Sequence, residues 1–313
     1  MKKHNFINRQ LVTLYYVSKN MCRKNDLTKF NYIPTINRPI YGIYHIYCYG
    51  NWKSLFEEQI IHLINSGLYN VTTKLYISVI SKSDNDIQWI EKHPLLNNNN
   101  FGGIIARHHE GSSYEYPALD FIMSFSKNKD ACIYYFHSKG VTYHGRNDLQ
   151  KDLAKRIKLG EEWRYMMEYF NFDNWKVAYN VLKTYDTYGC RLNDEYFPLW
   201  NREKYYAGNF WWANTQWINR LSPIEKEKKD NRWYSELWLL SKPGRFFCAF
   251  WGYYGEYNIA PHKCLYNKNL RVNIFYKQYY FVKFFFQYYM FYISYYKKKT
   301  INKIKTYINY KSI

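Results

Sequence analysis

The sequence predicts an α/β fold: a Rossmann-like, mostly parallel sheet flanked by helices, followed by an aromatic, basic helical tail. Apolar, aromatic-rich runs alternate with amphipathic segments from residue 40 to residue 136. Such alternation is typical of a parallel sheet with helices on its faces. The 313 residues suffice for one large α/β domain, and the 22% aromatic content excludes a wholly disordered chain.

The first half of the chain contains the parallel strands. Each expected strand is rich in β-branched and aromatic residues. The helices between them are expected from apolar residues at helical spacing and from stop signals at Gly67 and Pro94. The strands are expected at 40–49, 74–81, 103–107 and 130–136, and the helices at 52–65, from an Asp84 or Asp86 cap to Lys92, and at 114–126.

The second half has a less regular pattern. The aromatic segment 246–265 is expected to be irregular. The other expected elements are two helices within 147–182 that meet near 171–174, a return strand at 184–190, a strand-like run at 205–212, and helices at 214–221 and 233–240.

The formal net charge of +20 is concentrated at the two ends of the chain. Residues 1–39 carry +7, residues 267–313 carry +10, and the middle of the chain is nearly neutral. A nucleic-acid groove needs clustered Lys and Arg, so this distribution argues against one in the centre. We therefore expect three parts: a basic N-terminal extension at 1–39, a central α/β domain at 40–265 and a basic aromatic tail at 266–313.

The tail segment 274–296 has no acidic residue and precedes Lys297-Lys298-Lys299. Its two lysines and eight tyrosines make it a poor transmembrane span, so we expect an interfacial helix with peripheral membrane contact. The six cysteines form no CxxC pair, and the basic start lacks the apolar core of a signal peptide. These features predict a cytoplasmic protein.

The strongest candidate site follows the fourth expected strand, in the run YFHSKGV at 135–141. In open parallel sheets, ligands bind at the carboxyl ends of the strands. His137, Ser138 and Lys139 could bind a diphosphate by hydrogen bonds and charge, and Gly140 would let the backbone approach it closely. The alternative is an ordinary polar loop.

Two further segments are candidates. Gly208 and Asn209 precede the adjacent Trp211 and Trp212, a combination suited to a sugar, although core aromatic residues are the alternative. Glu236 lies in the first turn of an expected helix, where it would be ionised and could act as a general base. A solvated or helix-stabilising glutamate is the alternative.

Metal-binding patterns are weak. His262 is isolated in the sequence, and a lone histidine is more often structural. In the segment His108-His109-Glu110, neighbouring side chains of an extended chain point in opposite directions.

Taken together, these segments resemble glycosyltransferases of the GT-A fold, and more closely a group of bacterial and large-DNA-virus glycosyltransferases. The resemblance covers about residues 40–265. It is carried by YFHSKGV at 135–141, EWRYMM at 162–167, YDTYGC at 185–190 and YAGNFWWAN at 206–214.

The resemblance implies transfer of a sugar from a nucleotide-sugar donor to a hydroxyl of a glycan or glycoconjugate, with inversion. Glu236 would match the acidic base position and His262 the late metal-binding histidine. No DxD motif follows the fourth strand, so a need for Mn²⁺ or Mg²⁺ is in question, and Lys139 with Arg146 is expected to neutralise the leaving diphosphate. Tyr47 and Asp84, at strand ends, would face the nucleotide.

Two functions of other classes remain open. One is a non-catalytic carbohydrate- or membrane-binding module, which would bind saccharide without donor hydrolysis. The other is a nucleic-acid-binding protein that uses the basic ends, against which the neutral centre argues.

Overall fold

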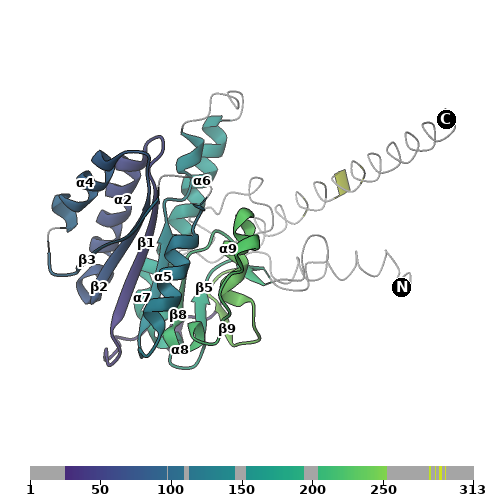
Figure 1. Ribbon diagram of the computed structural model, residues 1–313. Coiled ribbons are helices and arrows are strands. Elements are labelled where there is room, and N and C mark those ends of the chain that lie inside the picture. The colour runs from purple at the N-terminus through teal and green to yellow at the C-terminus, as the bar shows by residue number, and fades with distance from the viewer. Residues whose placement is uncertain are drawn as a thin grey trace.

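The computed structural model describes residues 25–96, 98–108, 113–144, 153–193 and 204–251, and five single residues of the tail. The described residues form three layers, with a central sheet between two layers of helices (Figure 1). The expected α/β fold with a mostly parallel, helix-flanked sheet is confirmed at this level.

The main sheet has seven strands in the order β3-β2-β1-β4-β8-β5-β9. The first four are parallel to one another. Strand β8 is antiparallel to both of its neighbours, and β5 and β9 are parallel. The strands are β1 (Ile40–Tyr47), β2 (Lys74–Ile80), β3 (Phe101–His108), β4 (Cys132–His137), β5 (Thr187–Gly189), β8 (Trp211–Asn214) and β9 (Phe246–Cys248), with β6 (Leu192–Asn193) and β7 (Tyr205–Tyr206) as a separate pair.

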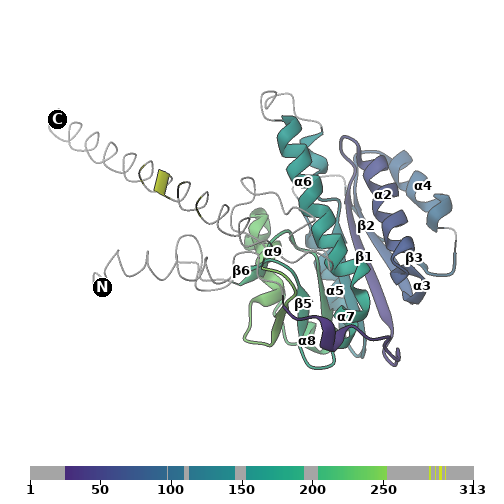
Figure 2. The same ribbon diagram turned by 180° about the vertical axis from the view of Figure 1, so that it is seen from behind.

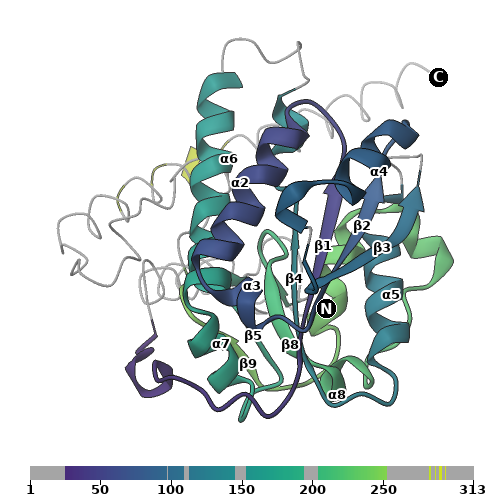
Figure 3. The ribbon, with the colours of Figure 1, turned by 90° about the vertical axis from the view of Figure 1, so that its left-hand side faces the viewer.

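Helices cover both faces of the sheet (Figures 2 and 3). One face carries α2 (Trp52–Asn65), α3 (Leu68–Val71), α4 (Asp84–Glu91), α6 (Leu153–Glu168) and α7 (Trp175–Val181). The other face carries α5 (Tyr116–Ser126), α8 (Thr215–Ile218) and α9 (Trp233–Leu237). A π-helical turn (Tyr169–Asp173) joins α6 to α7, where the sequence predicted that two helices meet.

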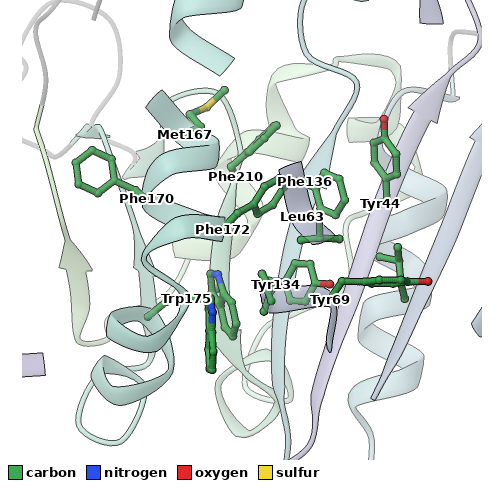
Figure 4. Packing of buried hydrophobic residues seen from close by; sticks show 14 of the residues in the cluster. Tyr44, Leu63, Tyr69, Tyr134, Phe136, Met167, Phe170, Phe172, Trp175 and Phe210 are labelled. Carbon is green, nitrogen blue, oxygen red and sulfur yellow. The ribbon is translucent and has the colours of Figure 1, made fainter. Parts of the chain in front are cut away.

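The strands separate the core into two layers because successive side chains point to opposite faces. On β4, Tyr134 and Phe136 pack toward α2 and α6, whereas Ile133 and Tyr135 pack toward α5. Figure 4 shows the first layer, in which the Phe136 ring lies 5.0 Å from that of Phe172. Alternate residues of β4 therefore reach different layers.

Three details of the expected elements differ from the structure. The N-cap of α4 is Ser83, whose side chain accepts from the Asn85 N–H, while the expected caps Asp84 and Asp86 lie within the first turn. The strand-like run at 205–212 is divided between β7 and β8 by a turn. The region expected to be irregular contains β9, which is completed only by pairing with β5.

Most of the N-terminal extension and of the tail lies outside the described residues. No helix among the described residues is both long enough and apolar enough to cross a membrane.

Candidate functional site

The order in which the chain adds strands to the sheet reverses between β1 and β4. From β1 the chain builds outward through β2 to β3, and then returns to place β4 on the other side of β1. Ligands of open α/β sheets bind at such a switch point, beyond the carboxyl ends of the strands. The ends of β1 and β4, at Tyr47 and His137, therefore mark the candidate site.

Ser138 links these two strand ends. Its N–H donates to the His45 carbonyl (3.0 Å), and its Oγ accepts from the Tyr47 N–H (2.9 Å). Ser138 is buried, so a role in holding the strand ends together is better supported than the expected contact with a diphosphate.

His137 lies at the end of β4 and donates from Nε2 to the carbonyl oxygen of Gly208 (2.9 Å), because a carbonyl can only accept. Burial lowers the pKa of His137; Glu115 opposes this effect and the charge of Lys139 reinforces it. His137 is therefore uncharged at neutral pH. The expectation that it helps to bind a diphosphate is limited to hydrogen bonding.

The Gly208 carbonyl that His137 contacts belongs to a tight turn formed by residues 206–209. The Asn209 N–H donates to the Tyr206 carbonyl (3.0 Å), and Gly208 has φ +94°, as expected at the third position of a type II turn. A Cβ on Gly208 would also crowd the Met167 side chain, so packing adds to the preference for glycine that the positive φ imposes. Asn209 has φ +55°, an uncommon value for a non-glycine residue that is often found at functional sites.

Glu115 is the carboxylate at the centre of this region. It immediately precedes α5 and is half-buried. Its Oε2 accepts from the Tyr135 hydroxyl (2.7 Å) and from Asn209 Nδ2 (2.6 Å). Within the described part of the chain, Oε1 accepts no hydrogen bond. One oxygen of Glu115 is thus fixed while the other is available to a ligand.

The surroundings of Glu115 favour its ionised form. Burial raises its pKa, but protonated His137 and His45 and the hydrogen bonds from Tyr135 and Asn209 together outweigh burial, so the pKa is lowered. The two hydrogen bonds act whether or not the histidines are charged. Glu115 is therefore a carboxylate at neutral pH.

His45 lies on β1, directly opposite His137 in the parallel register, and interacts electrostatically with Glu115. It is buried, and its Nδ1 lies 3.1 Å from the Ser78 hydroxyl. Burial lowers the pKa of His45 to about 4, so this ring is neutral at physiological pH.

Glu236 is a second carboxylate near Tyr135. It lies on α9, is 8% exposed, and contributes to raising the pKa of the Tyr135 hydroxyl. The preceding residue, Ser235, places its carbonyl 3.5 Å from Asn209 Nδ2. Glu236, Asn209 and Glu115 therefore lie in one region, as the sequence predicted for the first two.

Trp211 and Trp212 are core residues. They are 1% and 0% exposed and lie on opposite faces of β8, against Tyr135 and Tyr134. Trp211 Nε1 donates to Asn209 Oδ1 (2.9 Å), and Trp212 Nε1 donates to a backbone carbonyl of the π-helical turn. Neither indole offers a face for stacking on a sugar. The prediction that the two tryptophans form a sugar-stacking platform is therefore wrong, and the alternative, that they are core residues, holds. Trp211 orients Asn209.

The remaining expected residues are dispersed. Tyr47 is half-buried at the end of β1, with its ring stacked 5.6 Å from that of Tyr49. Asp84 is exposed at the start of α4, and no contact connects it with Glu115 or His137. Arg146 and His262 lie outside the described residues.

The position expected for a DxD motif does not fit a divalent cation. Mg²⁺ and Mn²⁺ prefer carboxylate and carbonyl oxygens, whereas His137, Ser138 and Lys139 offer a neutral ring, an engaged hydroxyl and a positive charge. Among the residues that the structure describes, no group of three or more His, Cys, Asp or Glu could hold a metal ion.

Sequence reasoning missed Glu115, Tyr135 and His45. One signal was available: His45 interrupts the otherwise apolar and aromatic run of β1. No sequence signal pointed to Glu115, because it lies beyond the residues that directly follow β3. The connection between β3 and α5 brings it to the site.

No protein-family model matches this chain, and the comparison with curated protein sequences finds no match either.

Proposed function

We propose that this protein is a glycosyltransferase that moves a sugar from a nucleotide-sugar donor to a hydroxyl acceptor. The observation that carries the proposal is Glu115, a half-buried carboxylate at the switch point with one oxygen anchored by Tyr135 and Asn209 and the other open. A positioned, ionised carboxylate is what deprotonation of an alcohol requires. The strand order, with its parallel β3-β2-β1-β4 half, is compatible with the proposed GT-A assignment.

The reaction is a single displacement at the anomeric carbon of the donor. The acceptor oxygen forms a bond to this carbon as its proton passes to a carboxylate. The bond from the carbon to the phosphate oxygen breaks, and its electron pair leaves with the nucleoside diphosphate. The configuration at the anomeric carbon is therefore inverted. The positive charge of Lys139, two residues beyond His137, favours the departing anion.

Two carboxylates compete for the role of base. Glu115 is favoured by geometry, because it is half-buried with one unengaged oxygen. Glu236 is favoured by the resemblance and remains the second candidate, although only 8% of it is exposed.

The test measures release of nucleotide from a panel of nucleotide sugars, with and without saccharide acceptors. We expect Glu115→Gln to reduce turnover by about 100-fold or more while leaving donor binding unchanged, because an amide cannot take the proton. Wild-type turnover by Glu115→Gln together with loss in Glu236→Gln would transfer the role to Glu236. Saccharide binding without any nucleotide release would favour the non-catalytic module instead.

We also propose that the tail contacts a membrane surface. Its described residues Val282, Phe286, Tyr289, Met290 and Ile293 are helical and each more than half exposed. Their spacing places them on one face of a helix, and the segment around them has no acidic residue. Co-sedimentation with anionic vesicles should fall when Phe286 and Met290 are replaced by Ser, and unchanged binding would refute this contact.

A further inference from the structure

An exposed apolar loop precedes β1, at the end of the sheet opposite the candidate site. Ile33 is 83% exposed, and Tyr32 and Ile36 are 49% and 40% exposed. Residues 28–37 contain no acidic side chain. Single apolar side chains on a surface need no explanation, but three exposed ones in one short segment form a patch, and such patches mark contact surfaces. Residues 32–36 are called the apolar loop below.

Two buried residues of α7, Asn180 and Tyr179, hold the apolar loop in place. Asn180 Nδ2 donates to the carbonyls of Phe30 (2.9 Å) and Tyr32 (3.0 Å). The Tyr179 hydroxyl accepts from the backbone N–H groups of residues 37 and 38, both at 3.1 Å. The loop is therefore fixed at both ends with its isoleucines in water, so docking them onto a partner costs little conformational entropy.

The apolar loop belongs to a rim at the amino ends of the parallel strands. The segment that follows β8 reaches the same rim, because β8 runs antiparallel to β4. Figure 3 shows the chain before β1 and the helix α8 together at this end of the sheet, at the lower edge of the view. The segments of this amino rim are 37–39, 72–73, 98–100, 127–131, 183–186, 215–220 and 242–245.

The amino rim is basic. Among its described residues, the acidic side chains are Asp130 and Asp186, and Asp130 pairs with Arg38 (3.6 Å). Lys183 lies beside the apolar loop, with its Nζ 5.2 Å from the centre of the Tyr32 ring. The exposed cations of the rim are Lys127, Lys129, Lys183, Arg220, Lys242 and Arg245. The rim therefore combines an apolar projection with an excess of positive charge.

This combination fits the surface of an anionic lipid bilayer. Apolar side chains gain free energy when they enter the boundary between headgroups and acyl chains, and a tyrosine ring is suited to the headgroup level. Lysine and arginine side chains around them attract anionic headgroups. A nucleic acid would also attract the cations, but its phosphates would leave Ile33 and Ile36 without an apolar partner.

We propose that the amino rim docks on an anionic lipid bilayer, with Ile33 and Ile36 inserted at the headgroup boundary. This contact is separate from the one proposed for the tail and does not depend on the proposed function. Strand β1 has eight residues, so the carboxyl ends of the strands lie about 25 Å from the docked rim. The candidate site would face away from the bilayer, toward groups that extend well beyond the lipid headgroups.

The test is sedimentation of the full chain with phosphatidylcholine vesicles, with and without phosphatidylserine. We expect binding that requires phosphatidylserine and weakens by about 10-fold or more in the double variant Ile33→Ser, Ile36→Ser, because two buried side chains are lost from the contact. The matched control is Ile61→Ser, which should bind as the wild type does, since Ile61 is 46% exposed on α2 and lies outside the rim. Wild-type binding by the double variant, or an equal loss in the control, would overturn the proposal.

Two measurements examine the charge and the place of the contact. The double variant Lys242→Gln, Arg245→Gln should weaken vesicle binding by about five-fold for each charge removed. Hydrogen exchange of the unmodified chain should slow in residues 31–36 when anionic vesicles are added. Unchanged exchange in this segment would also overturn the docking.

Two further outcomes would assign the surface elsewhere. If the isoleucine changes have no effect once Phe286→Ser and Met290→Ser are present, the tail alone accounts for membrane contact. If the chain ignores vesicles but binds duplex DNA in a way that Lys242→Gln and Arg245→Gln weaken, the rim is a nucleic-acid surface. Nucleotide release bears on neither outcome, so the docking and the proposed transferase activity can fail independently.

Discussion

Two histidine–carboxylate clusters lie on opposite sides of the sheet, and they differ in charge. Between α2 and α6, His62 contacts Glu168 through Nδ1 (2.9 Å) and Asp173 through Nε2 (3.1 Å). Burial lowers the pKa of His62, but these two hydrogen bonds more than compensate and raise it to about 9. At the switch point, His45 and His137 contact a hydroxyl and a carbonyl instead, and burial lowers both pKa values.

The difference shows that direct contact decides the charge of a buried histidine. His62 stays protonated because each of its ring nitrogens contacts a different carboxylate. Glu115 lies near the rings of His45 and His137 without a hydrogen bond to either, and it does not overcome the effect of burial on their pKa values. The first cluster is an internal ion network that fixes α6 to α2. The second leaves Glu115 as an anion beside uncharged rings, which suits a carboxylate that must take a proton.

The largest effect is expected from breaking the ion network at its most buried member. Glu168 is 1% exposed and contacts His62, Arg164 and Gln59. Glu168→Gln removes the charge with little change in shape and should lower the free energy of unfolding by about 3 kcal/mol. Urea denaturation measures this. A loss below about 1 kcal/mol would mean that the network contributes little.

The opposite pKa shifts predict a stability maximum near pH 6.5. Above pH 6.5, the folded state loses the stabilisation that protonated His62 provides, and this loss continues as the pH rises toward about 9. Below pH 6.5, unfolding is favoured because His45 takes up a proton more readily in the unfolded chain than in the folded one. We expect losses of roughly 1–2 kcal/mol at about pH 5.5 and about pH 8.5. His62→Gln should flatten the alkaline side only, and an unchanged alkaline slope would contradict the assignment.

A smaller effect is expected at Asn209, which supports Glu115 rather than the core. Asn209→Gly accepts the positive φ without strain but loses the bonds to Glu115 and Trp211, at a cost of about 1–2 kcal/mol. The pKa of Glu115 should rise, moving the acid side of the pH–activity profile upward. Asn209→Ala is the comparison, because it adds backbone strain to the same loss. An unmoved profile in both variants would mean that Asn209 does not act on Glu115.

The smallest effect is expected at the exposed side of the His62 ring. Asp173 is 39% exposed at its side chain, so solvent screens its interaction with Nε2. Asp173→Asn should cost less than about 1 kcal/mol and lower the His62 pKa, measured by NMR titration of the ring. A loss equal to that of Glu168→Gln would show that burial does not separate the two contacts.

The parallel half of the fold could be predicted because its signals are local. Runs such as Ile40–Tyr47 are apolar and are followed by clear stop residues, so periodicity locates them. Strand β9, in contrast, has only three residues and is defined by its pairing with β5, a long-range contact that no local pattern encodes. The same holds for Glu115, whose neighbours Tyr135 and Asn209 are distant in sequence.

The candidate site was predicted in part. His137, at the end of β4, does contact the carbonyl of Gly208, so the first residue of the predicted loop reaches the turn that carries Asn209. The role of the adjacent tryptophans was not predictable, since a pair at neighbouring strand positions reads the same whether its rings are buried or exposed. The sequence was equally consistent with two core residues, and the packing of the sheet shows that both tryptophans are in the core.

The reversed direction of β8 has a consequence for how the protein could diversify. In an all-parallel sheet, the segment that enters a strand arrives at the rim opposite the ligand. Because β8 runs antiparallel to β4, its entry segment, which contains Gly208 and Asn209, reaches the same rim as the carboxyl ends of the parallel strands. Under the proposed function, a substitution at Asn209 would therefore act at the ligand rim without changing the pairing of β1 with β2 and β4.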